Sequence, residues 1–103
     1  MTLYFNIRFP LVYGEYGFCQ IGNKKYDIKV DEDAGWYFIR GLENHGEFCK
    51  MLHDNFPDLF PKQTSDLLNQ FGYTVIDSKY FLEFFDLKGL EKFLKFVNNY
   101  SEI

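Results

Sequence analysis

Residues 72–100 carry the strongest structural pattern in the sequence, GYTVIDSKYFLEFFDLKGLEKFLKFVNNY. Their first part holds two runs rich in β-branched and aromatic side chains, 73–77 and 79–85, which predict two paired strands. Asp86 follows, where its carboxylate can accept hydrogen bonds from the free amides of a first helical turn. Over Leu87 to about Tyr100, apolar side chains recur at helical spacing and lysines hold the opposite side. We therefore expect a β-hairpin and an amphipathic helix that serve as scaffold.

The first forty residues predict four further strands. Residues 2–9 alternate apolar and polar side chains, the pattern of a strand with one buried face. Residues 18–21 and 26–30 are two similar runs, and the Gly-Asn-Lys-Lys segment 22–25 between them suits a tight hairpin turn, since Gly and Asn tolerate positive φ. Residues 36–39 are apolar on both faces, which predicts a strand in the centre of a sheet.

The middle of the chain predicts two helices. Asn44 and Glu47 fit a capping box at the start of a helix that spans residues 44–55. Residues 62–71 predict a second, shorter helix with an apolar stripe, and Gly72 suits the position just after its end.

Strands and helices that follow one another in separate runs predict an α+β fold. We expect a mainly antiparallel sheet of about six short strands, with about three helices packed on it. A chain of 103 residues has the usual size of one domain, so we expect residues 1–103 to form a single globular domain.

Composition excludes several classes of function. The formal net charge is −4 and the arginines are two, Arg8 and Arg40, which argues against binding to nucleic acid, where basic side chains supply the affinity. No window approaches the ~18 apolar residues of a membrane span, and the N-terminus lacks the basic start of a signal peptide. Two cysteines give little sign of an oxidising compartment. We therefore expect a cytoplasmic protein without nucleic-acid or membrane partners.

An acidic segment and nearby aromatic residues form the candidate partner-binding site. Residues 31–35, Asp-Glu-Asp-Ala-Gly, predict an acidic loop, and residues 11–17 predict an irregular segment that holds two tyrosines. Aromatic residues make up 21% of the chain, so some rings are expected on the surface, where they are enriched at protein interfaces. The alternative interpretation is that the acidic loop is only a solvated turn without any binding function. The residues predicted to contact a partner are Asp31, Glu32, Asp33 and Trp36, with Tyr13 and Tyr16 in second place.

A second candidate site lies on the first predicted helix. His45, Cys49 and His53 are four residues apart and share one ridge, which is compatible with a metal site or an activated thiol. A stable zinc site needs a fourth ligand, however, and Cys49 falls on the apolar stripe, where a thiol behaves as a small hydrophobic group. We expect a structural role for all three residues, and no metal, cofactor or catalytic residue.

These observations favour a small acidic inhibitor that binds another protein without catalysis. Immunity proteins and phage-encoded inhibitors share this size and charge, and an immunity or antitoxin protein would neutralise a basic toxin, such as a nuclease, by occluding its active site. Two alternatives stay open: a small metal-dependent or Cys/His enzyme module, and a structural or oligomerising subunit. The sequence does not determine the oligomeric state.

Overall fold

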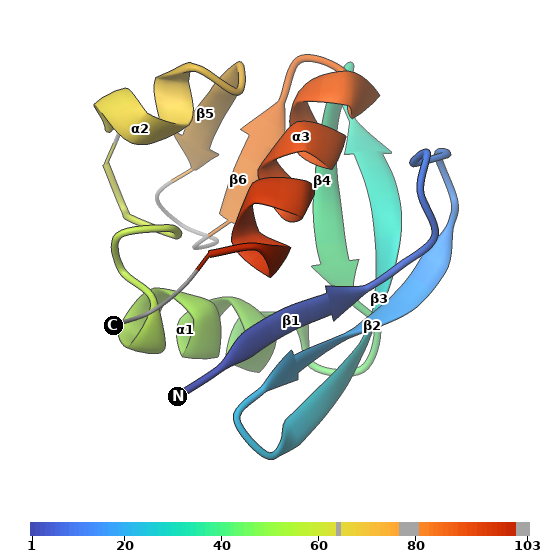
Figure 1. Ribbon diagram of the computed structural model, residues 1–103. Helices are drawn as coiled ribbons and strands as arrows, with labels where there is room; N and C mark the ends of the chain where they lie inside the picture. Colours follow the sequence, from blue (N-terminus) through green and yellow to red (C-terminus); the bar gives the residue numbers. More distant parts are fainter. Residues whose placement is uncertain (64, 77–80, 101–103) are drawn as a thin grey trace.

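The computed structural model describes residues 1–63, 65–76 and 81–100, which form an α+β fold around one sheet (Figure 1). The strands are β1 (Leu3–Asn6), β2 (Tyr16–Ile21), β3 (Lys24–Asp33), β4 (Trp36–Gly41), β5 (Tyr73–Ile76) and β6 (Phe81–Phe84). The helices are α1 (His45–Asn55) and α3 (Leu87–Asn98), and a single four-residue turn, α2 (Asp66–Asn69), lies between them in sequence.

The six strands form one curled antiparallel sheet in the order β1-β2-β3-β4-β6-β5. Figure 1 shows α3 lying across the inner face of this sheet and α1 below it. The predicted α+β class, the antiparallel sheet and its six strands are confirmed, and β4 is an interior strand as expected. The prediction of about three helices is wrong, because the described part of the chain holds two helices, and α2 is only one turn.

The predicted acidic loop is wrong in its first three residues, which are the end of β3. Asp33 is the register partner of Trp36, and Asp31 is the partner of Phe38. The hairpin closes with a two-residue turn, Ala34-Gly35, whose φ angles are +52° and +86°. Tight turns of this kind match the twist of the flanking strands, so pairing continues to the residues next to the turn.

Helix α1 agrees with its prediction to within one residue, but its capping box is only half formed. The Asn44 Oδ1 accepts a hydrogen bond from the Glu47 N–H at 3.1 Å. The Glu47 carboxylate forms an ion pair with Lys24, with 2.6 Å between Oε1 and Nζ, where a complete capping box would turn it back to the Asn44 N–H.

The second predicted helix, residues 62–71, is reduced to the turn α2. The Ser65 side chain caps this turn by accepting from the Leu68 N–H. The Ser65 N–H donates to the Tyr73 hydroxyl, so it is not available for the bond that a longer helix would make to the carbonyl four residues earlier. A side chain from β5 thus fixes where the helical turn begins.

The closing hairpin and helix are confirmed where the structure describes them, while residues 77–80 of the predicted strands lie outside the described ranges. The Asp86 carboxylate caps α3 by accepting from the Gly89 N–H at 2.8 Å. The apolar stripe predicted for α3 begins at Leu87, which is partly buried, and its other members, Leu90, Phe93, Leu94 and Val97, are buried. The ring of Phe93 contacts those of Phe60, Phe71 and Phe84.

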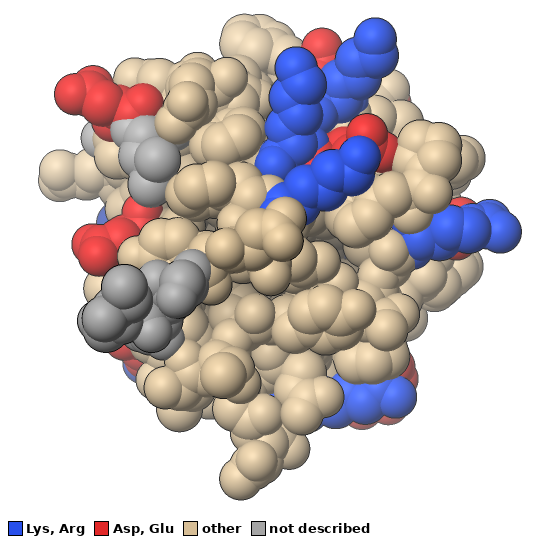
Figure 2. All heavy atoms as spheres, viewed as in Figure 1, with Lys and Arg blue, Asp and Glu red and all other residues tan. Residues whose placement is uncertain are grey.

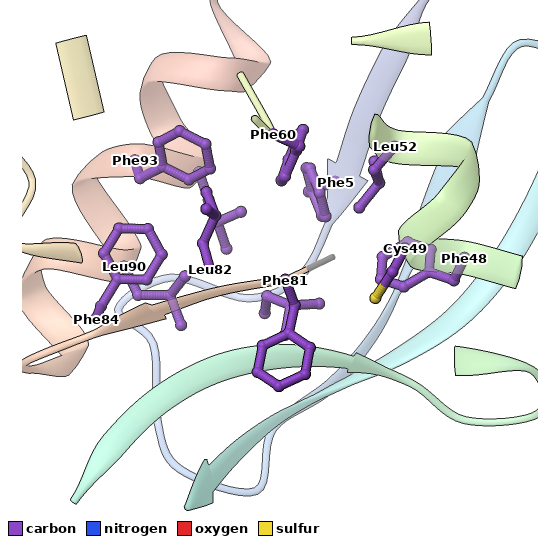
Figure 3. Close-up of a pocket in the computed structure, with 12 residues that line it drawn as sticks. Phe5, Phe48, Cys49, Leu52, Phe60, Phe81, Leu82, Phe84, Leu90 and Phe93 are labelled. Atoms are coloured by element: carbon purple, nitrogen blue, oxygen red, sulfur yellow. The ribbon is translucent and has the colours of Figure 1, made fainter. Parts of the chain in front are cut away.

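The core contains one small cavity of about 30 Å³ between α1, α3, β1 and β6 (Figure 3). Its walls are almost entirely Phe, Leu and Ile side chains, with Cys49 as the exception. A space of this size equals the share of about one water molecule, and an apolar lining gives such a water no partners. The cavity is therefore a packing gap and not a ligand site.

Neither helix in the described ranges is long and apolar enough to cross a membrane.

Candidate functional site

The side of the sheet that faces away from α3 carries acidic and aromatic side chains, which we call the acidic–aromatic face. Successive side chains of a strand point to opposite sides, and Phe84 points inward to Phe93 of α3, so its neighbours Glu83 and Phe85 point outward. The acidic–aromatic face consists of Asp31, Asp33, Trp36, Phe38, Phe81, Glu83 and Phe85.

Strand register places these residues in rows across β3, β4 and β6. Because Tyr37 pairs with Phe84, the antiparallel register sets Phe38 opposite Glu83 and Trp36 opposite Phe85. The register from β3 to β4 adds an aspartate to the far end of each row, Asp31 beside Phe38 and Asp33 beside Trp36. One row therefore runs from Asp31 over the Phe38 ring to Glu83, and the next runs from Asp33 to the rings of Trp36 and Phe85.

Two pairs of aromatic rings flank Glu83. Trp36 and Phe85 lie on one side with ring centroids 4.4 Å apart, and Phe38 stacks on Phe81 on the other side at 4.9 Å. The Phe85 ring is 67% exposed, whereas Phe38 is buried. The face thus combines an exposed aromatic ring with a carboxylate set between rings.

Glu83 is the one buried charged side chain in the described ranges, with 4% of its surface exposed. Within those ranges it has no hydrogen-bond or ion-pair partner. Burial raises the pKa of Glu83, and the nearby Asp33 carboxylate raises it further. A carboxylate in this state costs free energy, because burial removes most of its hydration and no donor in the described ranges replaces it.

The Glu83 carboxylate is still open to the outside. The one side-chain oxygen or nitrogen in the described ranges that is both fully buried and without a partner is the Tyr26 hydroxyl, so the Glu83 oxygens keep some contact with solvent. The Glu83 side chain points outward, so this contact with solvent is on the outer side of the sheet.

Basic residues border the acidic–aromatic face on the same side of the sheet. Lys29 and Arg40 are register partners in the next row along β3 and β4. Tyr16 pairs with Lys29 from β2, and the Lys29 ammonium lies 5.9 Å from the centre of the Tyr16 ring. A ligand for the whole surface would therefore meet carboxylates at one end and cations at the other.

The opposite side of the molecule is more basic. Figure 2 shows Lys and Arg side chains gathered over α3. The exposed lysines of this helix are Lys88, Lys92 and Lys95, and Lys95 pairs with Glu91 at 3.6 Å. The structure thus separates the acidic–aromatic face from the lysines of α3 by the thickness of the sheet and its core.

The structure divides the residues that the sequence predicted as partner contacts between two surfaces. Asp31, Asp33 and Trp36 lie together on the acidic–aromatic face, and Tyr16 lies beyond its basic border. Glu32 alternates to the inner side of β3 and pairs with Tyr37; as hydrogen-bond partner of the Tyr37 hydroxyl, its carboxylate raises the pKa of Tyr37. Tyr13 lies near Tyr37, because a charge on the Tyr13 hydroxyl also raises the pKa of Tyr37. The exposed fractions of Tyr13 and Tyr16 are 54% and 63%.

Sequence reasoning missed four members of the face, Phe38, Phe81, Glu83 and Phe85. It treated residues 72–100 as scaffold, although Glu83 is the only charged residue between Tyr80 and Phe85. A single carboxylate inside an otherwise apolar strand indicates a functional surface on its side of the strand, because charged residues are almost never buried without a partner.

The residues of the helical ridge do not form a metal site. His45 Nδ1 accepts from the Gly41 N–H at 3.0 Å, and its Nε2 lies 3.4 Å from the Cys49 sulfur. His53 Nδ1 instead bonds the Phe60 carbonyl oxygen at 2.9 Å. Burial raises the pKa of the Cys49 thiol to about 12, so it is not a thiolate nucleophile near neutral pH. In the described ranges, no group of three His, Cys, Asp or Glu side chains is placed to hold a metal ion.

A second hollow, of about 150 Å³, lies between β3 and the start of α1. Its charged residues include Lys24 and Glu47, which already form an ion pair with each other. Tyr26 is at the wall of this hollow. Its nearby side chain adds to the rise in the Lys24 pKa, which the Glu47 carboxylate chiefly causes. This hollow therefore offers a ligand fewer unsatisfied groups than the acidic–aromatic face.

Glu83 remains the only buried charge without a partner in the described ranges, and it lies beside the most exposed aromatic ring in them, Phe85. The acidic–aromatic face is accordingly the candidate functional site. No protein-family model, curated protein or solved structure matches this chain, so no residue role is carried over from a relative.

Proposed function

We propose that this protein binds a basic partner protein through the acidic–aromatic face and acts as an inhibitor of the immunity or antitoxin type. The observation that carries the proposal is the Glu83 carboxylate, which is buried between two ring pairs and has no donor among the residues that the structure describes. A folding protein gains nothing from such a group, whereas a partner that supplies a cation would remove its cost on binding.

The aromatic residues of the face suit the centre of an interface. Phe85 is 67% exposed and rests against Trp36, so both rings present apolar area to a partner. Trp and other large aromatic residues dominate binding energy when water is excluded around them, and acidic residues at their edge would form a polar rim. Asp31 and Asp33 occupy that edge.

Charge supports a basic partner over a second copy of this chain. Three carboxylates, those of Asp31, Asp33 and Glu83, lie on one face, and a symmetric dimer through this face would bring them close to their own copies. A basic protein would be attracted instead, which speeds association and makes it dependent on salt. Enzymes that cleave nucleic acids carry such a basic groove, because phosphate binding requires it.

The experiment compares the wild-type protein with two variants as baits in lysate of the source cells. Phe85→Ser removes the exposed ring of the face, and Tyr100→Ser removes a ring that follows α3 and is 43% exposed. We expect a basic protein that the wild type and Tyr100→Ser retain and Phe85→Ser loses.

The captured protein is then purified and its binding and enzymatic activity are measured with each variant. Inhibition that depends on Phe85 supports the proposal. Equal capture and equal inhibition by Phe85→Ser, or the absence of any basic protein that the wild type inhibits, would contradict it.

A further inference from the structure

We propose that the Glu83 carboxylate receives one arginine side chain of the partner. The guanidinium of this arginine bonds the carboxylates of Glu83 and Asp33 and stacks on the ring of Trp36 or Phe85. This inference rests on the proposed function and specifies the chemistry of its contact.

The first step is the state of Glu83 in the free protein. Its side chain is more than nine-tenths buried, and in the described ranges nothing donates to it. The charged groups that face its surroundings are Asp33 and Asp31 from β3 and Arg40 from β4, while His45 of α1 contacts the neighbouring Phe38 and Phe81 rings. The acidic neighbours repel the Glu83 charge, and Arg40, in the row of Lys29, makes no ion pair with it in the described ranges. No residue in the described ranges supplies this donor, and a partner protein can supply it.

The second step is the number of donors required. Asp31 already accepts from the Glu32 N–H at 2.9 Å, whereas neither Glu83 nor Asp33 has a donor in the described ranges. Asp33 lies close enough to Glu83 to raise its pKa. The two carboxylates lie in neighbouring rows of one face, on the strands that flank β4, and offer several acceptor positions. A guanidinium carries five N–H donors in a planar fork.

The third step is the aromatic platform. The Trp36 and Phe85 rings are 4.4 Å apart in the row next to Glu83, and Phe85 is exposed. A planar guanidinium stacks on aromatic rings while its edge bonds carboxylates, and it is more weakly hydrated than an ammonium group. Rings and carboxylates at one place thus favour arginine over lysine.

The test uses the full-length protein and a small probe, N-acetyl-arginine-N-methylamide, at constant ionic strength. Trp36 is the only tryptophan of the chain, so its fluorescence and its indole N–H signal report on this face alone. We expect a saturable change in both, and a ¹³C shift of the Glu83 carboxyl carbon. The matched lysine derivative should bind several-fold more weakly, and the norleucine derivative should give no saturable change.

The decisive variants are Glu83→Gln and Asp58→Asn. Both remove one negative charge, but Asp58 is an exposed residue of the connection after α1. Glu83→Gln should weaken the arginine probe about ten-fold, since a charge-assisted bond is replaced by a neutral one, and Asp58→Asn should leave it unchanged. Glu83→Gln is expected to fold, because it removes a buried charge, and thermal unfolding monitored by circular dichroism verifies this.

Several results would overturn the inference: no saturable response to the arginine probe, equal binding to Glu83→Gln, or a lysine derivative that binds as tightly as the arginine derivative. These results differ from a failure of the proposed function. If the probe does not bind but binding of a captured basic protein still depends on Phe85, the partner surface is supported and the arginine assignment is wrong. If the probe binds through Glu83 but every basic partner binds independently of Phe85, the proposed function falls.

Discussion

The side-chain amide of Asn98 forms two hydrogen bonds with the backbone of Phe5, accepting from its N–H and donating to its carbonyl oxygen, both at 2.9 Å. Phe5 belongs to the edge strand β1, whose outer backbone groups have no neighbouring strand. The Asn98 amide has the same donor and acceptor as a peptide group, so it pairs with the edge as a further strand would. One side chain at the end of α3 therefore ties the last helix to the first strand.

Asn98→Ala should lower the free energy of unfolding by about 2 kcal/mol, because it leaves a partly buried donor and acceptor of Phe5 without partners. Asn99→Ala is the matched control, since the Asn99 amide is exposed and bonds only the Lys95 carbonyl of its own helix. Its effect should stay below about 1 kcal/mol. Urea unfolding followed by circular dichroism measures both, and equal losses in the two variants would show that the bond to β1 contributes nothing.

Two helical glycines should respond to alanine in opposite directions. A Cβ at Gly89 would lie 2.3 Å from the Phe71 carbonyl oxygen, so the start of α3 approaches the backbone too closely for any side chain. A Cβ at Gly46, in the first turn of α1, meets nothing nearer than the Asn44 Oδ1 at 3.9 Å. Alanine is favoured over glycine in helices by about 1 kcal/mol, so Gly46→Ala should stabilise the protein by up to that amount.

Gly89→Ala should destabilise the protein by about 2 kcal/mol despite the same gain in helix propensity, because the backbone has to move. Thermal and urea unfolding of both variants check this pair. If Gly89→Ala were as stable as the wild type, α3 would not lie this close to Phe71.

Glu83 should make the stability of the protein depend on pH in a defined direction. Its pKa is raised by burial and by Asp33, so between the unfolded and folded pKa values the native state binds more protons than the unfolded state. The free energy of unfolding attributable to Glu83 is thus greatest below the unfolded pKa, near 4.3, and falls as the pH rises through the folded pKa. The loss is about 1.4 kcal/mol for each unit that separates the two values.

Glu83→Gln has no charge to lose, so its stability relative to the wild type should increase as the pH rises from about 4 through the folded pKa of Glu83. Urea unfolding at several pH values measures the difference, with Asp58→Asn as the control for a change in net charge. A constant difference between Glu83→Gln and wild type across this range would mean that the Glu83 carboxylate is solvated or paired.

Both cysteine thiols should be inert in the folded protein. Burial raises the pKa of Cys49 to about 12 and raises that of Cys19 as well, and the thiolate is the reactive form. A disulfide reagent such as dithionitrobenzoate at about pH 8 should label neither thiol in the native state and both after unfolding in guanidinium chloride. Fast labelling of Cys49 in the native state would revive the Cys/His enzyme alternative.

The repeating patterns were sufficient to predict most elements of the fold. The stripe of Leu90, Phe93, Leu94 and Val97 fixes α3, because few other arrangements bury those side chains together. The acidic end of β3 was missed, since Asp and Glu disfavour strands, and only the pairing that continues from Val30 and Ile39 to the turn holds them there. The second helix was overpredicted because the Tyr73 hydroxyl, eight residues away, takes the Ser65 N–H.

The candidate site was predicted only in part, for a reason of topology. Asp31, Asp33 and Trp36 are close in sequence, so their proximity follows from one hairpin. Glu83 and Phe85 come about fifty residues later and reach them because β6 pairs with β4. The local pattern of a strand says which side is buried but not which neighbour it takes, so this juxtaposition could not be read from sequence.

Asp33 and Glu32 are neighbours in sequence but lie on opposite sides of β3, so we expect their substitutions to have different effects on binding. Asp33 lies on the acidic–aromatic face opposite Trp36, whereas Glu32 alternates to the other side of β3 and faces Tyr37. Asp33→Asn should weaken binding of the blocked arginine probe several-fold, because it removes one of two carboxylates at that position. Glu32→Gln removes the same charge from an adjacent residue, and long-range attraction is nearly the same for both. Trp36 fluorescence titrations of the two variants should therefore differ, and equal weakening by both would indicate a general charge effect in place of a defined contact.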